Sequence, residues 1–98
     1  MTTTDSPEAA RELARSAVEA RLAACAQISG PIESVYRWEG KIEQAQEWVV
    51  TFKARALAYQ MLEAHIKKHH SYDVPEIIAT PITEGNPAYL SWVEENAS

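Results

Sequence analysis

The stretch from Ile32 to Lys53 constrains the fold more than any other part of the chain. Its first half and the end of its second half are rich in β-branched and aromatic residues, which favour strands. Glu39-Gly40 separates the two halves, and glycine accepts the positive φ angle that a tight turn requires. The pattern predicts a long β-hairpin. Four apolar residues of one parity then share a face, namely Ile42, Trp48, Val50 and Phe52.

This hairpin is longer than a domain of this size needs. At about 3.3 Å per residue, its strands would project beyond a compact core, and an isolated two-stranded ribbon is marginally stable in water. We therefore expect the hairpin to bind further copies of the chain. The alternative is two ordinary strands with irregular middles, because Ala45 and Gln46 are poor strand formers. The aromatic residues expected at the interface are Tyr36, Trp38, Trp48 and Tyr72.

The bulk properties describe one small globular domain. The chain has 98 residues and 46% hydrophobic residues, which suits a single domain over 1–98 with one core. Its net charge of −5 disfavours nucleic acid and anionic membranes as partners. Cys25 is the single cysteine, so it has no partner for an intrachain disulfide. With no leader pattern and no long apolar run visible, we expect a cytoplasmic protein.

The order of elements predicts an α+β fold. Ser6 or Asp5 followed by Pro7 is typical of a helix start, and Gly30 lies in a bend that interrupts the pattern before the hairpin. The expected elements are a strand stub at 1–4, a helix from about Pro7 to Ala24, the hairpin at 32–53, a helix ending near His69, a buried strand Glu76–Ile82 and a short helix Ala88–Glu95. This is a ferredoxin-like βαββαβ sandwich with a truncated first strand, a long hairpin between its second and third strands and a short C-terminal helix.

The second helix has a predicted buried side at helical spacing. The residues expected on that side are Leu57, Ala58, Met61, Leu62, His65 and Ile66. His65 and His69 are four residues apart and therefore share a face, a spacing at which two imidazoles can bind one transition metal ion.

Four motifs, in order, give the chain a specific resemblance. They are Leu22-Ala23-Ala24-Cys25, Ser34-Val35-Tyr36-Arg37-Trp38-Glu39-Gly40-Lys41-Ile42-Glu43, His70-Ser71-Tyr72-Asp73-Val74-Pro75-Glu76-Ile77-Ile78 and Tyr89-Leu90-Ser91-Trp92. In these motifs the chain resembles the CutA divalent-cation-tolerance family over nearly its whole length. The resemblance implies a homotrimer locked by long hairpins, an architecture similar to that of the PII signalling proteins. It also implies a link to divalent metal ions, most often copper.

The resemblance suggests metal ligands but also shows departures. It implies metal contact at His69, His70 and Glu76, with Cys25 as a weaker addition. Some members carry a cysteine ligand on the first strand, where this chain has Thr2, and the family's proline after the two histidines is a serine here. The family's first strand is also longer, so we expect a late chain start or another segment that fills the gap.

Each of these residues also has a purely structural interpretation. The two histidines at 69 and 70 could pair with free carbonyls at the helix end, and His65 could be an interior residue with satisfied hydrogen bonds. A free cysteine is usually a small buried hydrophobe. No nucleophile motif is present, so we expect no enzyme; a Cys25–His dyad is the weakest alternative.

The sequence leaves three functions open. The first is a non-enzymatic trimer of the CutA type that responds to divalent metals and binds copper. The second is a PII-like trimeric sensor that binds a small ligand in clefts between subunits and signals to a partner. The third is a structural trimer that serves as a scaffold.

Overall fold

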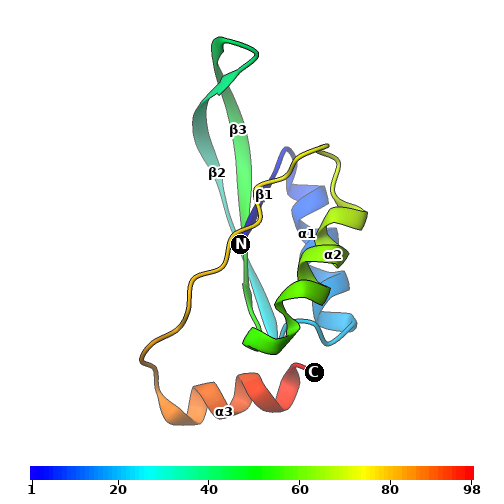
Figure 1. The fold of residues 1–98 in the computed structure, drawn as a ribbon, viewed down its shortest axis with the longest axis vertical. Helices are drawn as coiled ribbons and strands as arrows, with labels where there is room; N and C mark the ends of the chain where they lie inside the picture. The colour runs from blue at the N-terminus through cyan, green and yellow to red at the C-terminus, as the bar shows by residue number, and fades with distance from the viewer.

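A computed structural model describes all 98 residues (Figure 1). The elements in chain order are β1 (Thr2–Thr4), α1 (Pro7–Glu19), β2 (Cys25–Trp38), β3 (Lys41–Lys53), the 3-10 turn η1 (Ala56–Ala58), α2 (Tyr59–His69) and α3 (Pro87–Asn96). The predicted α+β class is therefore confirmed, with α1 and α2 packed side by side against the sheet and α3 at one end of the molecule. No helix is long and apolar enough to cross a lipid bilayer.

The sheet is antiparallel, with β3 in its centre and the order β1-β3-β2. The register of β2 and β3 places Cys25 opposite Lys53 at one end of the hairpin and Trp38 opposite Lys41 at the other. The turn residues Glu39 and Gly40 have φ angles of 49° and 78°, the positive values of a two-residue hairpin turn whose twist matches that of the strands. The predicted hairpin and its turn are thus confirmed.

The outer part of the hairpin has no third strand beside it. β1 pairs with β3 only at 48–50, so Ile32–Trp38 and Lys41–Glu47 form a free two-stranded ribbon, which we name the arm. Seven residues at about 3.3 Å each carry it roughly 23 Å past the end of β1. It gives the chain an elongated outline of 45 × 26 × 21 Å (Figure 1).

A bulge joins the arm to the base of β2. The register shifts between Ser29 and Ile32, so the bend expected at 29–31 lies within a continuous strand instead of before it. A bulge tolerates this because the extra residues need no ladder partner. Gly30 has a φ of 142°, and a Cβ there would lie 2.9 Å from Cδ1 of Trp48. Glycine is therefore required both by its backbone angle and by the close indole ring.

The predicted strand Glu76–Ile82 is wrong for the single chain. Only Ile77 forms a bridge, to Thr2, and the backbone N–H of Ile78 donates to the Met1 carbonyl at 3.1 Å. Antiparallel pairing leaves the residues after Ile78 with no β1 residue opposite them. Ile78 and Ile82 remain 50% and 53% exposed, whereas the apolar run predicted a buried strand.

The predicted first residues of the helices agree with the structure more closely than the residues predicted to be buried. The Ser6 hydroxyl accepts a hydrogen bond from the Ala9 N–H at 3.1 Å and caps α1. The helix ends at Glu19 and not at Ala24, since Arg21 takes a φ of 60° as the chain turns back to the sheet. Asn86 caps α3, which spans one residue more at each end than predicted.

The core lies between the helices and one face of the sheet. Its buried residues are Leu13, Ala17, Leu22, Leu62 and Ile66, with Phe52, Ala54 and Ile77 packed against them. Two residues predicted for the buried side of the second helix are wrong: Leu57 is 85% exposed and Met61 66%. The helical spacing identified the correct stripe in Leu62 and Ile66, but the stripe is narrower than predicted because only α1 and the sheet cover it.

Candidate functional site

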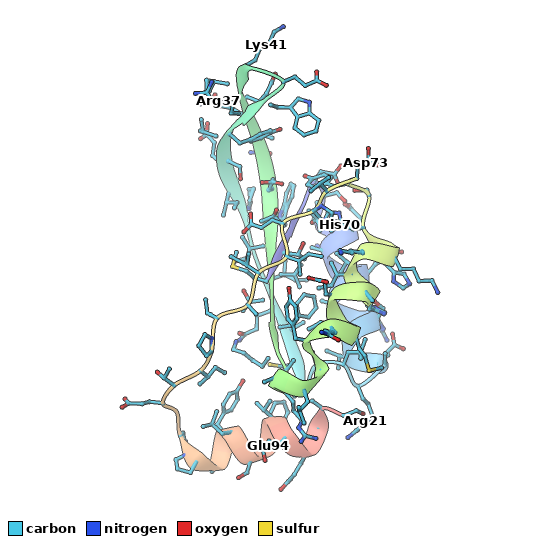
Figure 2. All side chains as sticks on the ribbon, viewed as in Figure 1. Arg21, Arg37, Lys41, His70, Asp73 and Glu94 are labelled. Carbon is cyan, nitrogen blue, oxygen red and sulfur yellow. The ribbon has the colours of Figure 1, made fainter.

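His70 lies immediately after α2 and connects two parts of the backbone (Figure 2). The Tyr72 N–H donates to His70 Nδ1 at 3.0 Å, which leaves the proton on Nε2. That Nε2–H donates to the Thr3 carbonyl on β1 at 2.7 Å. Both ring nitrogens are therefore engaged, and His70 can ligate a metal ion only after it gives up one of these hydrogen bonds.

His69 and His65 form a second group one turn earlier on α2. Their ring centroids are 4.4 Å apart. His69 Nδ1 lies 2.9 Å from the His65 carbonyl oxygen, and His65 Nε2 lies 2.8 Å from the Ser16 hydroxyl on α1. Partial burial lowers the pKa of His65, and the neighbouring His69 and Lys68 lower it further. His65 is therefore neutral at physiological pH.

Tyr72 ties the loop after α2 to the base of the arm. Its hydroxyl donates to Glu47 Oε2 at 2.8 Å, and its ring lies 4.7 Å from that of His70. Burial raises the pKa of Tyr72 well above its usual value, and the hydrogen bond to Glu47 and its charge raise it further. The phenol therefore stays protonated and holds Glu47 at the point where the arm leaves the sheet.

Glu76 and Thr2 lie near the β1 bridge. Glu76 is exposed, and its charge acts on the Met1 amino group, although burial is the larger effect and lowers the pKa of that amine. Thr2 is fully buried, and its Oγ1 has no hydrogen-bond partner. A neutral hydroxyl is a poor replacement for a thiolate as a copper ligand. The Thr2 position therefore supplies no soft donor.

Cys25 lies at the far end of the sheet from His70. Its Sγ is 3.6 Å from the Tyr89 hydroxyl of α3, and the hydrogen bond with Cys25 raises the pKa of Tyr89. The Tyr89 ring in turn stacks on Trp92 at 5.8 Å. Cys25 pairs with Lys53 in the sheet, whereas His70 contacts β1 beside Val49. Within one chain Cys25 has no histidine contact, so the Cys–His dyad does not form there.

The four candidate metal ligands do not meet in one chain. No group of three histidine, cysteine, aspartate or glutamate side chains comes together as a metal centre. The set of His69, His70, Glu76 and Cys25 therefore does not fit a closed site within a single copy. Sequence reasoning also gave no sign that Ser16 is the partner of His65, because 49 residues separate them.

The residues predicted for an interface lie on or beside the arm. Tyr36 and Trp38 are 44% and 57% exposed, and Arg37 and Lys41 lie near the tip (Figure 2). Trp48 and Tyr72 are half-buried at the arm's base. On the arm, Val35 and Ile42 add exposed apolar surface.

A second apolar surface lies at the base of the molecule. It is a groove between the end of β3, α2, the segment after Ile77 and α3. Its lining includes Phe52, Leu57, Ile77, Ile82 and Leu90. Residues 77–82, which were predicted to form a fourth strand, line one side of this groove.

The element order β1-α1-β2-β3-α2 and the sheet order β1-β3-β2, with Ile77 bridged to β1, are those of a ferredoxin-like protein whose last strand is reduced to one bridge. A comparison with known protein families shows which family of this fold the chain belongs to. The family described as "CutA1 divalent ion tolerance protein" matches residues 1–96, so the chain belongs to the CutA1 family, as the sequence motifs predicted.

Relatives and solved structures agree with this assignment. The "Divalent-cation tolerance protein CutA" of Thermus thermophilus is 45% identical over 94 residues, which cover 96% of this chain and 91% of that protein. "Protein CutA, chloroplastic" of Arabidopsis thaliana is 45% identical over 89 residues, 91% of this chain; the chain spans about half of that plant relative, at 49%. The solved CutA1 structure from Oryza sativa has a TM-score of 0.97 and 42% identity, covering 99% of this chain and 89% of that one.

Proposed function

We propose that this protein acts as a homotrimer in the tolerance of divalent metal ions and that it binds such an ion, with copper as the expected metal. The family's description as divalent ion tolerance proteins supports the metal link. The free arm is the structural observation that supports the assembly, because the single chain leaves it uncovered.

The arm leaves backbone and apolar side chains exposed. β2 is an edge strand along its whole length, and the outer edge of β3 is free beyond Trp48. Exposed strand edges are sites of pairing between chains. Val35, Trp38 and Ile42 are each more than half exposed on this ribbon, and an isolated two-stranded ribbon is only marginally stable in water. Neighbouring copies would cover both the edges and the side chains.

The metal part of the proposal concerns donors that one chain leaves apart. His69, His70, Glu76 and Cys25 are the candidates. A set of this kind would need donors from two subunits or a rearrangement of His70, whose nitrogens are both hydrogen-bonded. Imidazole and thiolate donors suit copper, and glutamate adds an oxygen donor. No enzyme activity is part of the proposal, since none of the named relatives carries the name of an enzyme.

Calorimetric titration with Cu²⁺ and with a panel of nucleotides tests this function. We expect heat with Cu²⁺ and none with nucleotides, together with an unchanged molar mass. A variant with His69→Ala and His70→Ala should lose the copper heat and keep its mass. Heat with a nucleotide but not with Cu²⁺ would favour the PII-like sensor, and no heat with any of these probes would favour a scaffold.

A further inference from the structure

We propose that His65 and His69 form a two-imidazole binding site for a late first-row divalent ion such as Cu²⁺ or Zn²⁺, with Ser16 as a positioning residue. The inference rests on the proposed involvement with divalent metals and replaces His70 by His65 as the partner of His69. It requires only one copy of the chain, so it does not depend on the trimer.

Helix geometry brings the two rings together. Residues four apart on an α-helix lie one turn apart on the same face, and the His65 and His69 centroids are 4.4 Å from each other with an interplanar angle of 36°. Both residues are in the last two turns of α2. Two imidazoles at this spacing are a recurrent arrangement for binding one transition metal ion.

The hydrogen bonds around Ser16 allow a tautomer of His65 that suits a metal ion. If the Ser16 hydroxyl donates to the Leu13 carbonyl at 3.2 Å, the Ser16 oxygen accepts from His65. In that arrangement the proton of neutral His65 is on Nε2, 2.8 Å from the Ser16 oxygen. Its Nδ1 keeps a lone pair for a metal ion.

A backbone carbonyl fixes the tautomer of His69. A carbonyl oxygen only accepts, so the 2.9 Å contact to the His65 carbonyl puts the His69 proton on Nδ1. Its Nε2 then keeps the lone pair, and the residue is exposed. Metal-bound histidines usually donate their other N–H to a carbonyl or a polar side chain, and both rings already have that second contact.

Lys67 and Lys68 place positive charge beside the pair, and the 3.7 Å contact between Lys67 and Glu63 offsets part of it. Two protein nitrogens leave the remaining coordination positions of a bound ion to water.

The chain has three histidines, which allows a matched test. The probes are CuCl₂ and ZnCl₂ added to the full chain, with affinity measured by calorimetry and nitrogen ligation by electron paramagnetic resonance of the Cu²⁺ form. His65→Gln and His69→Gln should each weaken metal binding by at least tenfold. Loss of a residue that only hydrogen-bonds a metal ligand already costs about tenfold or more in affinity, and loss of the ligand itself should cost no less. His70→Gln distinguishes the two ligand sets: native affinity is expected if His65 is the partner of His69, and weaker binding if His70 is.

Ser16→Ala separates positioning from packing. It leaves both imidazoles in place and removes only the oxygen that holds His65, so we expect an affinity loss of about tenfold. Ser16→Thr keeps the hydroxyl and should restore binding. A purely structural contact between α1 and α2 would instead lower the melting temperature and leave metal affinity unchanged.

Two results would overturn the inference. One is native affinity in His65→Gln. The other is a loss confined to His69→Gln and His70→Gln, which would leave the proposed metal function standing with its original ligands. Absence of binding to the native chain would overturn both metal assignments, while molar mass would still report on the trimer separately.

Discussion

The hydrogen bond between Tyr72 and Glu47 gives a quantitative test of how the arm is anchored. Tyr72→Phe removes the hydroxyl and leaves the ring in place. The bond is 2.8 Å long, part-buried and charge-assisted. Hydrogen bonds to charged groups contribute about 1.5–3 kcal/mol, and the partial exposure of this one indicates the lower end. We expect a loss of about 1.5 kcal/mol, which is roughly 6–12 °C in melting temperature for a domain of this size.

Tyr59→Phe is the control for this prediction. The Tyr59 hydroxyl donates to Glu63 at the same distance, 2.8 Å, but both residues are on α2, four positions apart. Tyr59 therefore connects no separate elements, and its substitution should cost clearly less. Urea unfolding of both variants at equal protein concentration measures the difference. Equal losses, or no loss for Tyr72→Phe, would refute the anchoring role.

The same contact predicts a pH dependence. The pKa of Tyr72 is raised above the ordinary value of 10.0, so the folded chain keeps this proton to a higher pH than the unfolded chain does. The stabilisation is therefore complete below about pH 10 and declines above it. Tyr72→Phe should show a shallower loss of stability between pH 9 and 11 than the native protein, measured by thermal unfolding; parallel curves would contradict this.

Three further substitutions test other parts of the fold. Ile66→Ala, at a core residue that is 1% exposed, should cost about 3 kcal/mol in urea unfolding. Ser6→Ala should cost about 1 kcal/mol and shorten α1 by circular dichroism, since it removes the N-terminal cap. Trp38→Ser should leave the single chain's fold intact but weaken assembly: a side chain that is 57% exposed leaves roughly 100 Å² to be covered, about 2.5 kcal/mol per chain.

Local signals were sufficient to predict the elements whose boundaries depend on nearby residues. The turn at Glu39-Gly40, the cap at Ser6 and the end of the second helix at His69 are all as predicted, because turn and cap chemistry depends on a few neighbouring residues. The core residues Leu13 and Ile66 also follow from helical spacing. The four family motifs identified the family from the sequence alone.

The remaining features depend on contacts between distant residues. Apolar character predicted a strand at 76–82, but a strand needs a partner, and β1 pairs only as far as Ile78. Helical spacing also predicted that Met61 is buried, but Met61 is exposed, because burial depends on which other element covers that face of the helix. For the candidate site, spacing found the His65–His69 pair, whereas the hydrogen bonds of His70 to β1 had no local signal.

Molar mass in solution tests the central claim most directly, because the exposed arm is the main reason to expect assembly. Light scattering coupled to size exclusion, repeated over a range of micromolar concentrations, measures it without a label. We expect a constant mass of three times the 10.9 kDa chain. A stable species of 10.9 kDa throughout that range would contradict it, since the arm would then persist alone in water with its edges and rings uncovered.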